Sequence, residues 1–117
     1  MRKYLFFSFS LGIFLISFNF AGAAQVGEQI NFFVDSSYDA HKRSELTAIL
    51  RIKSERAYFY IDNRYWNELN GANSEIFEDS LRALANEFDS VIYPKERAVF
   101  GSEWNPGIDN DPRVAVL

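Results

Sequence analysis

Apolar and polar positions alternate most clearly between residues 45 and 53. Four apolar residues occupy every second position there: Leu46, Ala48, Leu50 and Ile52. This period of two predicts a half-buried strand with all four side chains on one face. The next apolar run, residues 57–61, is rich in aromatic residues and predicts a second strand. Residues 54–56 separate the runs, with Ser54-Glu55 as a plausible turn, so we expect an antiparallel hairpin, preceded by a further strand over residues 30–34.

The spacing of apolar residues changes downstream of the hairpin. Five of them fall on one stripe of an α-helix: Phe77, Leu81, Leu84, Phe88 and Ile92. Asn73 or Ser74 is the predicted N-cap, and Pro94 the predicted end, because the residue before a proline disfavours helical geometry. The polar residues 62–73 are predicted to break the pattern, and residues 95–100 to form one more short turn.

The C-terminal end of the sequence combines a polar turn with an apolar strand. Asp109-Asn110-Asp111-Pro112 predicts the turn, and Arg113–Leu117 the strand. Because a strand this apolar is normally covered on both faces, we expect a buried core strand. So few elements cannot cover it together with the helix stripe. We therefore predict an incomplete α+β domain, the front of a longer protein: strand, antiparallel β-hairpin, one long amphipathic helix, loop and a C-terminal buried strand.

The amino-terminal residues have the three parts of a secretory signal peptide. Arg2 and Lys3 are basic, residues 4–20 form an uncharged apolar run, and Ala21-Gly22-Ala23 supplies a small-residue cleavage site. We predict a signal peptide over residues 1–23, cleaved at about Ala23/Ala24, and a domain over residues 24–117. The predicted location is secreted or periplasmic, without stable membrane association after cleavage. The alternative is a single membrane anchor, which the polar residues within the run disfavour.

Charge and cysteine content narrow the classes of partner. Removing Arg2 and Lys3 from the 12 basic residues leaves 10 against 16 acidic ones, a net charge of −6. An acidic chain without a basic patch disfavours nucleic acid and anionic membrane surfaces as partners. The sequence has no cysteine, which excludes a thiolate zinc site, and export without disulfides is typical of bacterial proteins.

Few residues are candidates for chemistry. His41 is the one histidine and, beside Lys42 and Arg43, is interpreted as solvated. Asp109 and Asp111 are weak candidates for calcium ligands, since two carboxylates two residues apart can face one hard cation. The alternative is a turn in which these aspartates hydrogen-bond their own backbone. No catalytic residue and no cofactor are predicted in this chain.

A structural role is predicted for the residues around the last turn: Trp104, Pro106, Gly107 and Pro112. Together with the upstream hairpin, "YPKERAVFGSEWNPGIDNDPRVAVL" resembles the N-terminal part of secreted bacterial zinc metallopeptidases of the hyicolysin type. In that family an aromatic-rich hairpin precedes a helix with F-D-x-x-I-Y-P. A segment like F-G-x-E-W-x-P-G-I-D-N-D-P-R then leads into a core strand. The resemblance spans about residues 45–117.

The resemblance implies a zinc peptidase only for a longer parent protein. The family's H-E-x-x-H helix, in which two histidines hold zinc and the glutamate acts on bound water, is absent from this sequence. No zinc or catalytic residue is therefore carried over. The expectation is an inactive leading fragment whose parent cleaves polypeptide substrates with Zn. The alternative function is a small exported binding or interaction module that pairs its sheet edge with a partner strand.

Overall fold

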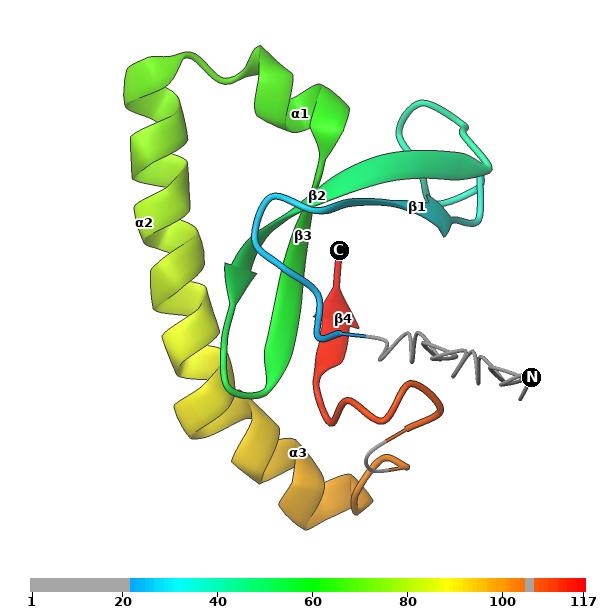
Figure 1. Ribbon diagram of the computed structural model, residues 1–117, viewed down its shortest axis with the longest axis vertical. Coiled ribbons are helices and arrows are strands. Elements are labelled where there is room, and N and C mark those ends of the chain that lie inside the picture. Colours follow the sequence, from blue (N-terminus) through cyan, green and yellow to red (C-terminus); the bar gives the residue numbers. More distant parts are fainter. Residues whose placement is uncertain (1–21, 105–106) are drawn as a thin grey trace, which may run out of the picture.

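The computed structural model describes residues 22–104 and 107–117, and they form a mixed α+β fold (Figure 1). One curled sheet has the strand order β1-β2-β3-β4. Its strands are β1 (Gln29–Phe33), β2 (Glu45–Lys53), β3 (Ala57–Asp62) and β4 (Val114–Val116). The predicted antiparallel hairpin is confirmed, because β2 pairs antiparallel with β3, and β1 adds antiparallel to the other side of β2.

A bulge in β2 changes which side of the sheet its residues face. The register of the β2–β3 pair shifts between Leu50, which lies opposite Tyr60, and Ile52, which lies opposite Phe59. An extra residue in one strand reverses the alternation beyond it. Leu50 therefore belongs to the apolar cluster on one face and Ile52 to the cluster on the other. The prediction that Ile52 shares a face with Leu46, Ala48 and Leu50 is wrong, although all four side chains are buried.

The C-terminal strand is an edge strand and is only half-buried. β4 pairs parallel with β3, and the sheet order places no strand on its other side among the described residues. Val114 and Val116 pack against the helix-side core, whereas Ala115 faces the opposite side and is exposed. The prediction of a strand buried on both faces is therefore wrong for β4. Its position at the edge leaves Leu117 53% exposed.

The segment predicted to break the pattern, residues 62–73, instead contains helical turns. Asp62 caps α1 (Asn63–Glu68) by accepting a hydrogen bond from the Arg64 backbone N–H at 2.9 Å. Asn70, rather than Asn73 or Ser74, caps α2 (Gly71–Glu87) through its side-chain oxygen. Because Asp and Asn side chains satisfy the free N–H groups of a helix start, these polar residues begin helices rather than interrupt them.

The long helix does not end at Pro94. After α2 the chain continues through a wider π-helical turn, η1 (Phe88–Ile92), into α3 (Tyr93–Phe100). The Tyr93 N–H bonds to the Phe88 carbonyl, five residues back. A proline inside an α-helix lacks the N–H and clashes with the carbonyl four residues earlier. The extra residue in the π turn relieves that conflict. The helix therefore continues past Pro94 with a wider turn instead of ending there.

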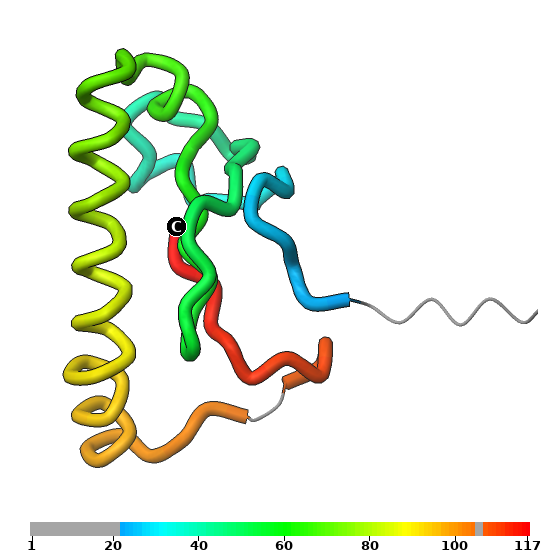
Figure 2. The backbone as a smooth tube through the Cα atoms, turned by 60° about the vertical axis from the view of Figure 1, so that its left-hand side comes forward, coloured from blue at the N-terminus to red at the C-terminus, as the bar shows by residue number. Residues whose placement is uncertain are grey.

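The helix covers one face of the sheet, and the amino-terminal segment crosses the other (Figure 2). Leu81 and Ala85 of α2 pack with Ile52, Ala57 and Phe59 on the helix face. Phe77 and Phe88 of the predicted stripe also contact this cluster, but Leu84 is 47% exposed. Ala85 is buried in place of Leu84. The spacing of apolar residues predicts a helix but does not determine which of two adjacent positions faces the sheet.

The predicted signal peptide lies outside the described residues except for Gly22 and Ala23. Within the described part of the chain, no helix combines the length and apolar character needed to cross a membrane.

Candidate functional site

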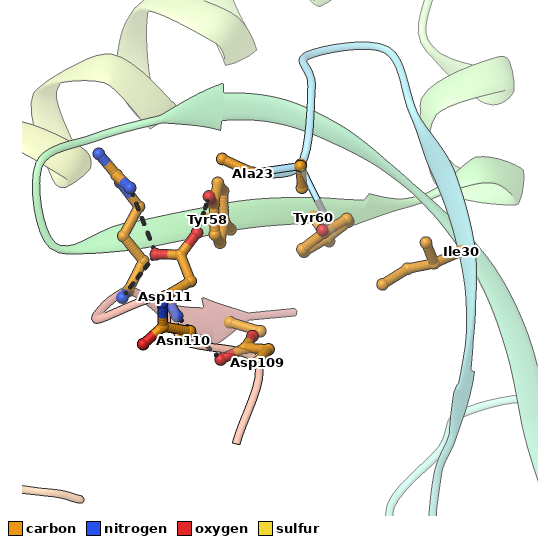
Figure 3. Close-up of a pocket in the computed structure, with 11 residues that line it drawn as sticks. Ala23, Ile30, Tyr58, Tyr60, Asp109, Asn110 and Asp111 are labelled. Atoms are coloured by element: carbon orange, nitrogen blue, oxygen red, sulfur yellow. Dashed lines mark hydrogen bonds and ion pairs between the residues drawn. The ribbon is translucent and has the colours of Figure 1, made fainter. Parts of the chain in front are cut away.

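A hollow lies on the sheet face opposite the helix (Figure 3). Its volume is about 450 Å³. Three parts of the chain meet there: the amino-terminal segment, strands β1 and β3, and the loop that leads into β4. The lining residues are Gly22, Ala23, Ala24, Ile30, Tyr58, Tyr60, Asp109, Asn110, Asp111, Arg113 and Ala115. We name this face the open face, because no helix of the described residues covers it.

Two tyrosines of β3 form the floor of the hollow. Tyr58 and Tyr60 are two positions apart and therefore point to the same face of the strand. Both are buried, and the ring of Phe32 meets Tyr60 edge-on with 5.1 Å between centroids. Burial is the main cause that raises the pKa of both phenols, and for Tyr58 the neighbouring Asp111 carboxylate adds to it. Both tyrosines therefore stay neutral near physiological pH.

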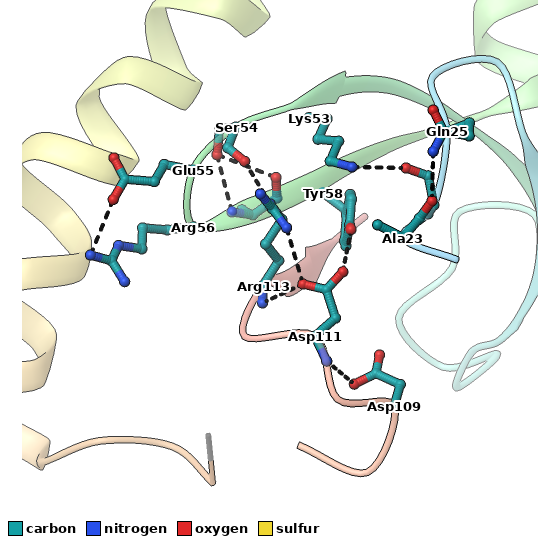
Figure 4. A network of polar contacts seen from close by, with 12 residues as sticks. Ala23, Gln25, Lys53, Ser54, Glu55, Arg56, Tyr58, Asp109, Asp111 and Arg113 are labelled. Atoms are coloured by element: carbon teal, nitrogen blue, oxygen red, sulfur yellow. Dashed lines mark hydrogen bonds and ion pairs between the residues drawn. The ribbon is translucent and has the colours of Figure 1, made fainter. Parts of the chain in front are cut away.

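Asp111 is the centre of a polar network between the loop and the hairpin (Figure 4). The Tyr58 hydroxyl donates to one carboxylate oxygen. The other oxygen accepts from the Arg113 backbone N–H at 3.0 Å and from its guanidinium at 3.3 Å. The Arg113 Nε then donates to the Ser54 carbonyl at 2.9 Å. This chain of contacts ties the segment before β4 to the turn between β2 and β3.

The network favours the ionised form of Asp111. Burial of the carboxyl opposes ionisation, but the hydrogen bonds from Tyr58 and from the Arg113 backbone, together with the Arg113 charge, hold the pKa of Asp111 below its ordinary value. A carboxylate that accepts several hydrogen bonds behaves in this way. Asp111 is therefore a fixed negative charge at the rim of the hollow.

The turn before Asp111 uses its polar side chains on its own backbone. Asp109 accepts a hydrogen bond from the Asp111 N–H at 3.2 Å. Gly107 has φ of 85° and Asn110 φ of 60°, left-handed conformations that glycine and asparagine tolerate. The geometry matches the self-bonded turn. No group of three or more metal-ligating side chains occurs among the described residues. Calcium binding by Asp109 and Asp111 remains a prediction.

The other residues predicted to be structural have different surroundings. Gly107 is constrained, since an added Cβ would lie 3.3 Å from Asp109 Oδ1. Trp104 is 77% exposed, so burial of its ring contributes little to the predicted role. Pro112 is exposed at the start of the last segment, and Pro106 lies outside the described residues. The lone histidine, His41, is exposed in the loop after β1, as its polar neighbours indicate.

Asp89 organises the hairpin turn, a role that its sequence position did not predict. It lies in η1, and its carboxylate accepts from the Ser54 hydroxyl and the Glu55 and Arg56 backbone N–H groups at 2.9, 2.9 and 3.1 Å. Next to it, Phe88 meets Phe59 edge-on with 6.0 Å between centroids. The hairpin turn lacks Gly or Asn, and that absence was the available indication that a distant side chain completes it.

Two further side-chain contacts involve the long helix. Tyr93 donates to Glu103 at 2.5 Å, which fastens the loop after α3, and this bond is the main cause that raises the pKa of the tyrosine. In α2, Glu78 pairs with Arg51 of β2 at 2.7 Å, and the Arg51 guanidinium lies 3.9 Å from the Trp66 ring centroid. Their wide sequence separation left no periodic pattern from which either contact could be predicted.

The open face brings together side chains of kinds that can bind ligands. Aromatic rings, a fixed carboxylate and a guanidinium converge there, and these groups hold cations and polar ligands. Among the residues lining the hollow there is no histidine to act as a base for Tyr58. No protein-family model, curated protein or solved structure matches the chain.

Proposed function

We propose that residues 24–117 are the leading, non-catalytic part of a secreted zinc metallopeptidase-like protein. The proposal begins from the resemblance of residues 45–117 to the hyicolysin type of zinc metallopeptidase. In this proposal the unit supplies a rigid sheet and backing helix, and the catalytic helix belongs to sequence beyond Leu117.

One observation carries the proposal: several polar residues that match the family pattern make the contacts that join the elements. Asp89 caps the hairpin turn, and Tyr93 bonds Glu103. Asp111 and Arg113 fasten the loop to Tyr58 and to the Ser54 carbonyl. Polar side chains that form internal contacts hold the elements of the fold together, which is the role of a structural scaffold. This agrees with a lead-in segment whose task is to set β4 beside β3.

The described residues do not fit a zinc site of their own. The chain has one histidine and no cysteine, and catalytic zinc takes three protein ligands drawn mainly from His, Cys and carboxylates. His41 is exposed in a loop, where it belongs to no cluster of ligating side chains in the described residues. Zinc and polypeptide substrate therefore belong, in this proposal, to the parent protein, and no catalytic step is assigned to this chain.

The DNA that follows the codon for Leu117 tests this function. An open reading frame that encodes H-E-x-x-H within a helical pattern is the expected result. A stop codon directly after Leu117, followed by a terminator, would contradict it. The test is independent of whether the protein folds or is exported in a given host.

The edge of the sheet favours a second candidate, an exported binding module. β4 presents one side to β3 and leaves the other without a partner strand among the described residues. Its sequence, Val-Ala-Val, carries no charge or proline that would block pairing with another strand. In this case a partner polypeptide would add as a strand beside β4. A stop codon after Leu117, together with binding of an extended peptide that protects the Ala115 amide from exchange, would favour this candidate.

A further inference from the structure

The segment that follows the predicted cleavage site is part of the folded domain. Ala24 is half-buried against the open-face cluster, whereas Gly22 and Ala23 before it are exposed. The Gly27 N–H bonds to the Leu50 carbonyl at 2.7 Å, and the Leu50 N–H bonds back to the Glu28 carbonyl at 2.8 Å. The first residue after the predicted cut, Ala24, therefore already packs against this face of the sheet.

Ala24 lies directly in the hollow described above. It lines that hollow together with Tyr58, Tyr60 and Asp111, as do Gly22 and Ala23 before the predicted cut. The carbonyl of Ala24 accepts from Lys53 Nζ at 3.4 Å, which fixes the peptide from the β2 side. The turn from Gln25 to Glu28 closes on itself, since the Gln25 N–H donates to Glu28 Oε2 at 3.0 Å. A chain end at Ala24 would have little freedom to leave the sheet.

The surroundings suit a positive charge at that chain end. An aromatic face attracts a cation, and a fixed carboxylate attracts it further. Tyr58 and Tyr60 supply the rings, and Asp111 is held ionised by its hydrogen bonds. Two positive charges already face this site: Arg113 is bonded to Asp111 and to the Ser54 carbonyl, and Lys53 Nζ lies 5.5 Å from the centroid of the Tyr58 ring. The titratable and charged groups facing the hollow or its amino-terminal wall are Glu28, Lys53, Tyr58, Tyr60, Asp109, Asp111 and Arg113.

We propose that leader removal after Ala23 creates an α-ammonium group on Ala24 that is bound in this hollow and locks the amino-terminal segment onto the open face. The signal peptidase adds water across the Ala23–Ala24 peptide bond. The leader departs with the Ala23 carboxylate, and the Ala24 nitrogen takes up a proton. Processing then completes the fold as well as releasing the protein. The inference rests on the leader removal in the proposed function, but not on its peptidase parentage.

The test uses the processed protein, recovered after expression of the full chain in a bacterial host. Mass spectrometry is expected to place its first residue at Ala24. NMR titration of the ¹⁵N-labelled α-amine is expected to show a pKa above the ordinary range of roughly 7.7–8.0. Selective acetylation of the α-amine is expected to lower Tm by roughly 4 °C at about pH 6, where the group is charged. This effect should disappear as the pH rises through the raised pKa, because the bound charge is lost.

A pair of matched variants separates the hollow from a general effect of acetylation. In Asp111→Asn the acetylation effect should shrink, whereas in Asp79→Asn, an exposed acid on α2, it should be unchanged. An α-amine that titrates in the ordinary range, with Tm insensitive to acetylation, would overturn the inference. An equal acetylation effect in both variants would also overturn it. A retained leader would refute the processing step, while the DNA test would still decide the peptidase parentage.

Discussion

The two faces of the sheet are closed by different means. On the helix face, Phe59 and Ala57 are covered by α2 through apolar contact along one continuous helix. On the open face, Tyr58 and Tyr60 are covered by the curl of β1 and by two chain segments that polar contacts hold in place. Alternate residues of β3 are thus covered in two ways: by apolar helix packing on one face, and by chain segments held by polar contacts on the other.

This difference indicates which face contributes most to the stability of the unit. Apolar burial contributes in proportion to the area removed from water, and the helix face provides it over a long contact. A closure by hydrogen bonds contributes less per contact but depends on specific partners. The open face should therefore loosen first, and selectively, when one of its polar contacts is removed.

The largest expected effect comes from the centre of the helix face. Phe59→Ala removes a ring that is 2% exposed and contacts Phe88, and should lower the free energy of unfolding by about 3–5 kcal/mol. Urea unfolding followed by circular dichroism measures it. The control is Phe100→Ala, at a position 84% exposed, with an expected change within about 0.5 kcal/mol. Similar losses in the two variants would refute the helix-face core.

The next effect tests the link between the hairpin and the helix. Asp89→Ala leaves the Ser54 hydroxyl and two backbone N–H groups of the turn without their acceptor. Loss of the shared acceptor should cost about 1–3 kcal/mol in the same unfolding measurement. Asp79→Ala, an exposed position of the same helix, is the control and should change stability by about 0.5 kcal/mol or less. An Asp89 variant as stable as this control would show that the turn holds without the helix.

A smaller effect is expected on the open face. Tyr58→Phe keeps the ring in the cluster but removes the hydroxyl that donates to Asp111. The expected cost is about 0.5–1.5 kcal/mol by thermal unfolding. Tyr38→Phe, at a position 90% exposed, is the matched control and should have no effect. If Tyr58→Phe cost as much as Phe59→Ala, the two faces would not differ in the way described.

The smallest effect is a dependence on pH. Because the pKa of Asp111 is held below its ordinary value of 3.8, its ionised form stabilises the fold above that value. This stabilisation is lost as the pH falls through the lowered pKa. The stability gap between the native protein and Asp111→Asn should be about 1 kcal/mol or less at neutral pH and should narrow in acid. A gap that stays constant down to acid unfolding would contradict this role.

The strands and the long helix were predictable because their burial has a period. Residues 45–53 alternate, and Phe77, Leu81 and Phe88 repeat at helical spacing, so pairing and cover followed from local geometry. The bulge after Leu50 and the π turn before Pro94 were not predictable in this way. Each is a single-residue insertion whose position depends on what the strand or helix meets in the folded protein.

The candidate site was predictable only in part. The turn formers Gly107 and Asn110 marked the loop, and Asp109 and Asp111 were recognised as chemically notable. Tyr58, the partner of Asp111, was not, because a contact across 53 residues of sequence leaves no local pattern. β4 was predicted as fully buried because its composition is apolar. Composition alone does not distinguish an edge strand from a central one.

Hydrogen exchange at the Val114 amide tests the central claim most directly. The claim is that polar contacts of the loop before β4 hold this strand beside β3. This N–H bonds to the Arg56 carbonyl at 3.0 Å and reports the pairing of the two strands. In Asp111→Asn, its protection should fall severalfold, up to roughly fivefold for a cost of about 1 kcal/mol, while amides of the β2–β3 hairpin keep theirs. Unchanged protection at Val114, or an equal loss throughout the hairpin, would contradict the account.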